Sequence, residues 1–404
     1  MSDSKDGALR QLWDTFFSKT WPMWVGGILL ALLNICLFIV KSPWGGSGTY
    51  INWGQNFYKL IGIFGLENTP PITAHLYGLI GLLTLIGAFA GALLSKEFAI
   101  RIPPIGEMLK GLVGGILMAI GCTIGIGCTI GGFMSGWPAL SAGAIFLAVG
   151  FMIGAFLALR YILWEMEHLP KLSMGKSFTL LAAKSKSGNW QPILGVIIVA
   201  FFLIGGSLFY KNNLIFTWFA IIGLFLGLIC QRSRFCITRA FREPFMTGES
   251  EAPVAVMAAL ALGIFGFTVI KYMGISGAAY PGGARAVALT WVYSHFWLKA
   301  LIGGTIFGIG MVIAGGCAVG TLWRMGEGQI KLWFSGIGFT LMAPISKKFI
   351  VPWVSHILPD WAQKKVFLPD YVGYWGAVLI LMVILLLWYM FVKWNERTGK
   401  FSAV

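Results

Sequence analysis

Apolar runs of about 20 residues recur along the whole chain, and this is the length that an α-helix needs to cross the hydrocarbon core of a bilayer. Hydrophobic residues make up 57% of the sequence and charged residues only 11%, whereas an ordinary soluble domain is roughly 25% charged. We therefore predict an all-α, polytopic membrane protein of about ten spans with no room for a soluble catalytic domain. The predicted spans lie near residues 23–40, 73–94, 111–134, 141–163, 191–210, 214–231, 252–273, 298–321, 332–350 and 373–392.

The formal net charge of +15 has to be divided between the two sides of the membrane before it indicates a partner. If the N-terminus is cytoplasmic, about twice as many Lys and Arg fall on the inner side as on the outer side, in agreement with the positive-inside rule. We therefore expect a multi-pass protein of the cytoplasmic membrane with both termini in the cytoplasm, and no nucleic-acid partner. The longest inner connector, residues 164–190, separates two predicted membrane repeats, 1–190 and 191–404.

A glycine-rich motif that ends in cysteine occurs once in each half. Residues 114–128 read GGILMAIGCTIGIGC, residues 303–317 read GGTIFGIGMVIAGGC, and both copies follow the pattern GG-x5-G-x5-GC-x2-G. The copies lie on the third and eighth predicted spans, so the second copy crosses the bilayer in the opposite direction. This predicts two inverted repeats, an arrangement in which transporter folds place their site near the midplane. The leading glycine pairs, Gly114–Gly115 and Gly303–Gly304, could equally serve close helix packing alone.

Further glycines flank the cysteine at the end of each copy, and they weaken a helix there. They are Gly127 and Gly131 around Cys128, and Gly315, Gly316 and Gly320 around Cys317. A broken helix frees backbone N–H groups inside the membrane, which is tolerable only where they face protein or a cavity. We therefore predict that Cys128 and Cys317 line a cavity and that these glycines support the breaks.

A third cysteine, Cys236, lies in QRSRFC (231–236), where a span runs into several arginines. The arginines could be a positive-inside anchor and nothing more. They could also form a cationic entrance that collects or discharges an anion, and we include Arg232 and Arg234 with Cys236 in the predicted path.

Acidic residues are missing from the interior of the predicted spans and occur only at segment ends. Proton-coupled pumps and cation carriers usually keep carboxylates there, so a carboxylate-driven mechanism is disfavoured. A core of thiols, freed N–H groups and helix ends suits a large, soft, polarisable anion instead. Glu327 in RMGEGQ is interpreted either as a partner of Arg324 or as part of an exposed surface pair, and we leave it outside the site.

The cysteine spacing leaves other interpretations open. Cys122–Cys128 and Cys230–Cys236 are both C-x5-C, which is not a zinc spacing, and the histidines lie outside both motifs, so we expect no metal site and no cofactor. The two pairs could instead exchange electrons in a membrane thiol oxidoreductase. A channel for a soft cation that uses Cys and Met is a further alternative, against which the basic residues argue.

Three segments together resemble the YeeE/YedE family of bacterial sulfur-transport membrane proteins, whose members include thiosulfate uptake transporters. They are QRSRFC followed by AFREP, GGTIFGIGMVIAGGCAVGTLWRMGEGQ (303–329) and GGILMAIGCTIGIGCTIGG (114–132), and the resemblance covers nearly the whole chain. The half that contains Arg-x-x-Phe-Cys comes first in the thiosulfate transporters and second here. The order of the halves and the length are more similar to the YedE branch.

This resemblance implies an hourglass-like fold in which short re-entrant helices dip inward from both faces. It implies a transporter, not an enzyme, that takes up thiosulfate or a related sulfur or selenium anion by S–H contacts with Cys128, Cys236 and Cys317. A small cytoplasmic sulfurtransferase often accepts the sulfur in this family, and such a partner is expected here. Cys122 lies outside the family pattern and Cys230 is not clearly part of it, which leaves redox chemistry open.

Overall fold

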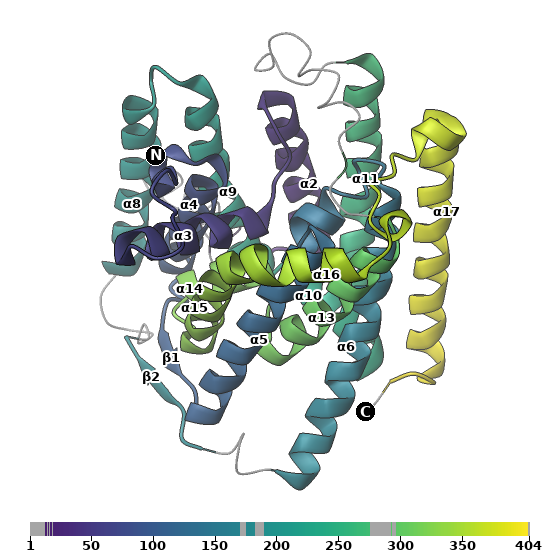
Figure 1. Cartoon of the computed structure of the whole chain (residues 1–404). Helices are drawn as coiled ribbons and strands as arrows, with labels where there is room; N and C mark the ends of the chain where they lie inside the picture. The colour runs from purple at the N-terminus through teal and green to yellow at the C-terminus, as the bar shows by residue number, and fades with distance from the viewer. Residues whose placement is uncertain are drawn as a thin grey trace, which may run out of the picture.

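The computed structural model describes residues 13, 15, 17, 19–169, 175–181, 190–274, 292 and 296–402. These residues are almost entirely helical, which confirms the predicted all-α fold (Figure 1). The α-helices are α2 (Met23–Val40), α3 (Gly46–Ile61), α4 (Leu76–Leu94), α5 (Ile105–Gly125), α6 (Ala142–His168), α8 (Trp190–Phe209), α9 (Leu214–Ser233), α10 (Ile237–Met246), α11 (Glu251–Met273), α13 (Leu298–Ala314), α14 (Ala318–Gly326), α15 (Ile330–Ile345), α16 (Val351–Ile357) and α17 (Pro369–Thr398).

The remaining elements are short. Two 3-10 turns, η2 (Ile72–Ala74) and η5 (Asp360–Ala362), and two π-helical turns, η3 (Thr129–Met134) and η4 (Ser346–Ile350), connect or extend the helices. The strands β1 (Ile100–Ile102) and β2 (Phe178–Leu180) form one antiparallel pair in which Arg101 lies opposite Thr179. Parts of the connector predicted over 164–190 fall outside the described residues.

Nine segments of the described chain are long and apolar enough to cross a membrane. They are Met23–Val40, Leu76–Leu94, Ile105–Met134, Ala142–His168, Trp190–Phe209, Leu214–Met246, Glu251–Met273, Leu298–Gly326 and Pro369–Thr398. The predicted span at 332–350 is not among them, because α15 ends after 16 residues and η4 and α16 follow it. In Figure 1, α16 and α3 run horizontally, whereas α8, α9 and α17 run vertically.

The two glycine-cysteine motifs form α5 and α13, and these helices pack against each other in antiparallel directions. A Cβ atom at Gly114 would lie 2.6 Å from the backbone nitrogen of Ala314, and one at Gly121 would lie 2.6 Å from the carbonyl oxygen of Gly303. Both distances are far below van der Waals contact, so only glycine lets the two backbones approach this closely. The packing role that was one interpretation of these glycines is therefore present.

The predicted repeat relates the most extensively packed helix pairs to one another. If α2, α4, α5 and α6 correspond to α9, α11, α13 and α15, then the pair α4–α9 corresponds to α11–α2 and the pair α6–α13 to α15–α5. The pair α5–α13 corresponds to itself, because α5 and α13 are counterparts. This pattern supports the inverted-repeat prediction, and we retain the halves 1–190 and 191–404 as a proposal.

The helices α8 and α17 fall outside this correspondence and lie at opposite edges of the molecule in Figure 1. Only 6% of the apolar window of α8 and 28% of that of α17 is buried inside the protein. Such long apolar faces are what lipid tails cover in a membrane protein. The core therefore lies between these two edge helices, where the broken spans meet.

Candidate functional site

Three of the candidate spans are broken, and a cysteine lies at each break. α5 gives way to η3, α9 to α10 and α13 to α14, and the residues that precede the three short helices are Cys128, Cys236 and Cys317. Each cysteine has an extended backbone, and the residue two positions earlier is left-handed. Those residues are Ile126, Arg234 and Gly315, with φ of 50°, 53° and 83°. The first two have side chains that disfavour this conformation, which costs on the order of 1–3 kcal/mol, as is common at functional sites.

Two of the predicted supporting glycines donate backbone N–H groups to the cysteine sulfurs. Gly131 N lies 3.5 Å from Cys128 Sγ, and Gly320 N lies 3.4 Å from Cys317 Sγ. Both amides belong to the first turn after a break, where a helix has N–H groups without intrahelical partners. The short helices that follow Cys128 and Cys317 therefore begin with their positive ends directed at sulfur.

The other predicted glycines shape the breaks. A Cβ atom at Gly127 would collide with the Cα of Gly132, so the chain on the two sides of Cys128 is pressed together. Gly316 lies more loosely against Leu332, 3.1 Å from where its Cβ would be. Gly315 supplies the left-handed turn.

The structure brings two of the three cysteines together. The thiols of Cys236 and Cys317 are near enough to influence each other directly. A Cβ atom at Gly320 would lie 3.4 Å from the sulfur of Cys317 and 3.7 Å from that of Cys236, so Gly320 faces both thiols. Cys128 lies beside the start of α3, with its sulfur 3.4 Å from where a Cβ of Gly46 would be.

All three cysteines are buried, with 0%, 1% and 2% of their surface exposed at Cys128, Cys236 and Cys317. The cavity between the short helices measures about 10 Å³ and is lined by Cys317 and Cys230 among apolar residues. A space of this size is at the lower limit for a single water molecule. The site is therefore closed in this conformation, and passage of an anion requires the short helices to move.

A fourth turn of chain enters the same region from the first half, and the sequence prediction did not assign it. Trp44, which is 2% exposed, lines the cavity beside Cys317. It precedes Gly45, the residue before α3, and its N–H group donates to Asn34 Oδ1 at 2.8 Å. Because α3 lies between α2 and α4 in the chain and α10 lies between α9 and α11, the helix correspondence given above makes α3 the counterpart of α10. The PWGGSG run (43–48) after the first span was the available signal, because it repeats the pattern of a span followed by a glycine break.

Buried hydroxyl groups accompany the cysteines, and the sequence prediction missed these as well. Thr129 and Thr238 lie beside the thiols of Cys317 and Cys236 respectively. Their oxygens have no partner of normal hydrogen-bond geometry among the described residues. The Tyr50 hydroxyl donates to the carbonyl oxygen of Ala318 at 2.7 Å. Hydroxyl groups therefore lie beside the thiols, and the Arg324 guanidinium is close enough to Cys236 to act on it electrostatically.

The predicted arginines are neutralised by carboxylates. Arg232 Nη1 lies 3.1 Å and Arg234 Nη2 3.0 Å from Glu97 Oε2, and Arg234 Nη1 lies 2.7 Å from Glu327 Oε1. Gln231 Nε2 donates to both carboxylates. Arg232 and Arg234 therefore fasten the end of α9, and their charges are not free in the way that a cationic entrance requires.

Glu327 occupies a different place from the one expected. The sequence analysis paired it with Arg324 or left it on the surface, whereas it is fully buried and forms its ion pair with Arg234. Burial raises the pKa of the Glu327 carboxyl, and the neighbouring Arg234 opposes this shift. Arg324 instead donates to the carbonyl oxygen of Gly315 at 2.6 Å. The expected i, i+3 pair is wrong because Arg324 and Glu327 leave α14 toward different partners.

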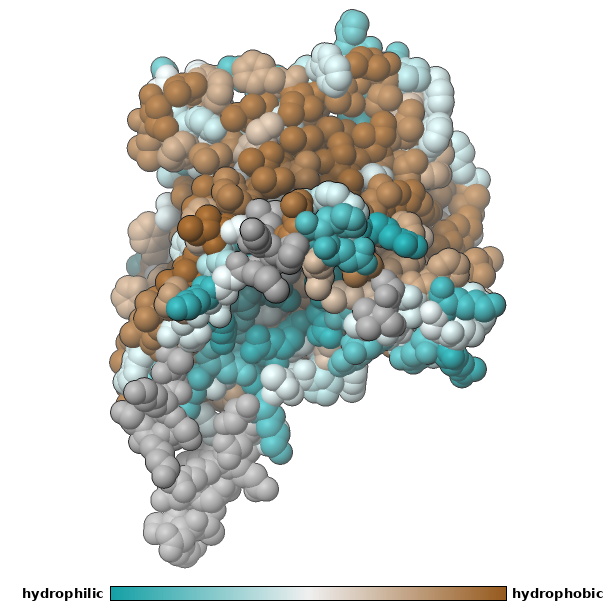
Figure 2. Space-filling view, turned by 90° about the horizontal axis from the view of Figure 1, so that it is seen from below, coloured by the Kyte–Doolittle hydropathy of each residue, from teal (hydrophilic) through white to brown (hydrophobic). Residues whose placement is uncertain are grey.

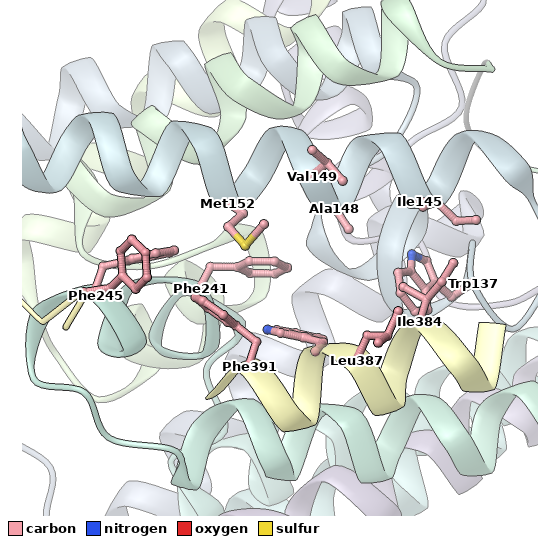
Figure 3. Close-up of a pocket in the computed structure, with 12 residues that line it drawn as sticks. Trp137, Ile145, Ala148, Val149, Met152, Phe241, Phe245, Ile384, Leu387 and Phe391 are labelled. Atoms are coloured by element: carbon pink, nitrogen blue, oxygen red, sulfur yellow. The ribbon is translucent and has the colours of Figure 1, made fainter. Parts of the chain in front are cut away.

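A larger pocket lies beneath α17, but its chemistry is unsuited to an anion (Figure 3). It measures about 380 Å³ and is lined by aromatic and aliphatic side chains of α6, α10 and α17, among them Met152, Phe241 and Phe391. Charged side chains are absent from its lining as described. Its surface matches an acyl chain, and we leave it outside the site.

The cysteines are free thiols, and this holds for all six, each of which is described. Cys122 donates to the carbonyl oxygen of Ala119 at 3.3 Å within α5, and Cys36 is exposed on the outer side of α2. Within the described ranges, no group of three or more His, Cys, Asp or Glu side chains is placed to hold a metal ion.

Comparison with known proteins identifies what the chain is similar to. A family model described as sulphur transport matches residues 2–157 and 232–403, which is well over half of the chain. A protein of Escherichia coli (strain K12) named probable transporter YedE is 25% identical over 98% of this chain and 97% of its own length. The thiosulfate transporters TsuA of Escherichia coli (strain K12) and Spirochaeta thermophila are 29% and 26% identical, over 41% and 45% of this chain and 44% and 56% of their own lengths.

Proposed function

Because the chain belongs to the sulphur transport family, as its motifs predicted, we propose that it takes up thiosulfate or a related sulfur or selenium anion along a path lined by Cys128, Cys236 and Cys317. The family and the relatives make it a multi-pass membrane transporter of sulfur compounds and not an enzyme. The oxidoreductase alternative is therefore set aside. The anion, the direction of transport and the cysteine path are the parts that we propose.

The observation that carries the proposal is that the thiols of Cys236 and Cys317 lie together beside Gly320. These residues are far apart in the sequence, and each lies at a break in a different span. Gly320 faces both sulfurs, so a solute that entered between them would touch both thiols and the first turn of α14.

Physical chemistry favours a soft anion at this place. A thiol donates only a weak hydrogen bond, so it can replace part of the water around an ion without holding the ion tightly. The positive ends of α10 and α14 add favourable electrostatics for negative charge, and no lysine or arginine lines the small cavity to trap it. Discontinuous helices whose ends face an anionic substrate are a recurring arrangement in transporters.

The closed cavity requires a rearrangement during transport. The short helices η3, α10 and α14 are each attached to a longer helix through a left-handed turn, and such turns can absorb a change in backbone angle. We propose that separation of Cys236 from Cys317 opens the path and that Cys128 makes the next contact. The distribution of Lys and Arg supports termini in the cytoplasm. We propose that the protein lies in the cytoplasmic membrane and releases the anion toward a small cytoplasmic sulfurtransferase, as the family resemblance implies.

Uptake of radiolabelled thiosulfate into proteoliposomes tests the proposal. We expect Cys317→Ala and Cys236→Ala each to lower the uptake rate by at least tenfold, because each removes one of the two neighbouring thiols. Cys128→Ala should lower it as well. Cys36→Ala is the matched control, since Cys36 is exposed on the outside of α2, and it should transport like the unmodified protein.

The same assay separates thiol chemistry from size. A serine hydroxyl is smaller, harder and better hydrated than a thiol, so Cys317→Ser should do worse than its small change in volume suggests. Copper(I) should not compete with thiosulfate for uptake, whereas a soft-cation channel would show such competition. Unaltered thiosulfate uptake after combined replacement of Cys128 and Cys317 by alanine would contradict the cysteine path.

A further inference from the structure

A second cavity, of about 430 Å³, lies on the side of the molecule where β1 pairs with β2. Four cationic side chains line it, Arg101 from β1, Arg242 from α10, Arg324 from α14 and Lys331 from α15. Figure 1 shows the two strands toward the lower side of the molecule, and Figure 2 shows the molecule from that side. In Figure 2, hydrophilic side chains gather in the lower part of the picture and hydrophobic ones in the upper part. Neither the family match nor the predicted cysteine path accounts for this basic cavity.

The charges in this cavity are poorly compensated. Lys331 forms an ion pair with Glu107, but Arg101, Arg242 and Arg324 have no carboxylate within ion-pair distance in the described chain. Arg101 and Arg324 donate only to the neutral carbonyl oxygens of Glu97 and Gly315.

The arginines also have donors to spare. The Nε atoms of Arg242 and Arg324 are buried and have no hydrogen-bond partner among the described residues. Guanidinium groups that form no ion pair within the described chain and gather around one cavity suit an oxyanion, which arginine binds through charge-assisted hydrogen bonds.

The cavity is linked to the cysteine site through the turn that precedes α14. Gly315 lines it, and Gly315 is the left-handed residue two positions before Cys317. Arg324 holds the carbonyl group of Gly315 from within α14, the helix that begins at Cys317. An anion that leaves the thiols on this side would therefore pass the turn at Gly315 and meet the arginines of the cavity.

We propose that this cavity is a second anion-binding site, which holds a small divalent sulfur oxyanion at the end of the cysteine path. The identity of the ligand rests on the proposed function, whereas the presence of an anion site rests on the arginines alone. Arg242 is the residue to test, because within the described residues its side chain forms no recorded hydrogen bond or ion pair, and its Nε atom is buried without a partner. Its replacement therefore changes the charge of the cavity without breaking a recorded hydrogen bond or ion pair.

The experiment measures binding rather than transport. Thiosulfate is titrated by calorimetry into the purified full-length protein carrying Cys317→Ala, so that the cysteine path is disabled, and into the same protein with a second change. Arg242→Gln should weaken thiosulfate binding at least tenfold, and Arg242→Lys should restore most of it. Arg397→Gln removes an exposed arginine at the end of α17 and is the control for net charge, expected to leave binding unchanged.

The outcomes separate this site from the cysteine path. Tenfold weaker binding in Arg242→Gln supports the site even if cysteine variants transport normally, and in that case only the proposed path fails. Equal affinity in Arg242→Gln and its parent, or no measurable thiosulfate binding to the parent, overturns the second site. Titration with inorganic phosphate and with phosphatidylglycerol nanodiscs identifies a lipid-headgroup site, which would also overturn the proposal if Arg242 affects those ligands and not thiosulfate.

Discussion

Gly320 illustrates how a single residue can govern the space between two thiols. Among the described residues, the sulfurs of Cys317 and Cys236 are the neighbours recorded within 4 Å of a Cβ placed at Gly320. We expect Gly320→Val to lower thiosulfate uptake at least tenfold, because its methyl groups would fill the place where a solute contacts both thiols. Gly320→Ala should keep most of the activity, since a Cβ alone fits at 3.4 Å and 3.7 Å from the sulfurs.

The pair of variants is informative because both keep the N–H group of Gly320 that donates to Cys317. A difference in uptake between them therefore reports obstruction and not loss of that hydrogen bond. Gly320→Val should melt at a somewhat lower temperature than Gly320→Ala in detergent, because its additional methyl groups overpack a buried site, so uptake is compared below both melting temperatures. Uptake by Gly320→Val at the unmodified rate would show that the solute does not pass between Cys236 and Cys317.

Single residues also mark the limit of inference from sequence. Cys128 and Cys317 could be placed at helix breaks because glycines beside them reveal a local weakness of the helix. The partners of Arg232 and Arg234 could not be predicted, because Glu97 and Glu327 come from distant segments and only the fold brings them near. Local patterns thus located the breaks, whereas the ion pairs depend on tertiary contacts.

At the level of helices, the close approach of α5 and α13 depends on glycines at their contact surface. Gly121→Ala places a methyl group 2.6 Å from the carbonyl oxygen of Gly303, and overpacking of this kind costs about 1–3 kcal/mol. We therefore expect a melting temperature several degrees lower in detergent, measured by tryptophan fluorescence or by size-exclusion chromatography after heating.

The matched control is Gly205→Ala in α8. No non-neighbouring atom of the described chain lies within 4 Å of a Cβ at Gly205, so the added methyl group meets open space. Alanine favours a helix by about 1 kcal/mol over glycine, and Gly205→Ala should leave the melting temperature unchanged or slightly raised. Equal melting temperatures for the two variants would mean that the backbones of α5 and α13 can separate at no cost.

Helices show a second limit of inference from sequence. The long apolar helices follow the hydrophobic runs closely, as α2 and α9 do, because lipid exposure selects for apolar residues along the whole helix. The predicted span at 332–350 failed because hydropathy does not distinguish a crossing helix from a shorter buried one such as α15, whose Gly338 packs against α5. An apolar sequence indicates that a helix is shielded from water, but not whether lipid or protein surrounds it.

For the whole molecule, the two ends of the described chain meet the same connecting segment. The N–H group of Trp21 donates to the carbonyl oxygen of Arg232, and the side chain of Asn395 donates to the carbonyl oxygen of Pro244. Both acceptors belong to residues 232–250, which run from the last turn of α9 through α10 to the start of α11. The two ends of the protein are therefore expected on one side of the membrane.

The charge distribution assigns that side to the cytoplasm, because residues 232–242 carry a concentration of arginines. Green fluorescent protein, which does not fluoresce after export in an unfolded form, should therefore fluoresce when fused to either end of the chain. Alkaline phosphatase, which needs an oxidising compartment, should be inactive at both ends and active when inserted in the turn at 211–213, between α8 and α9. Active phosphatase at either end, together with a dark fluorescent fusion there, would reverse the orientation, and the basic cavity beside Gly315 would then have to serve entry of the anion instead of its exit.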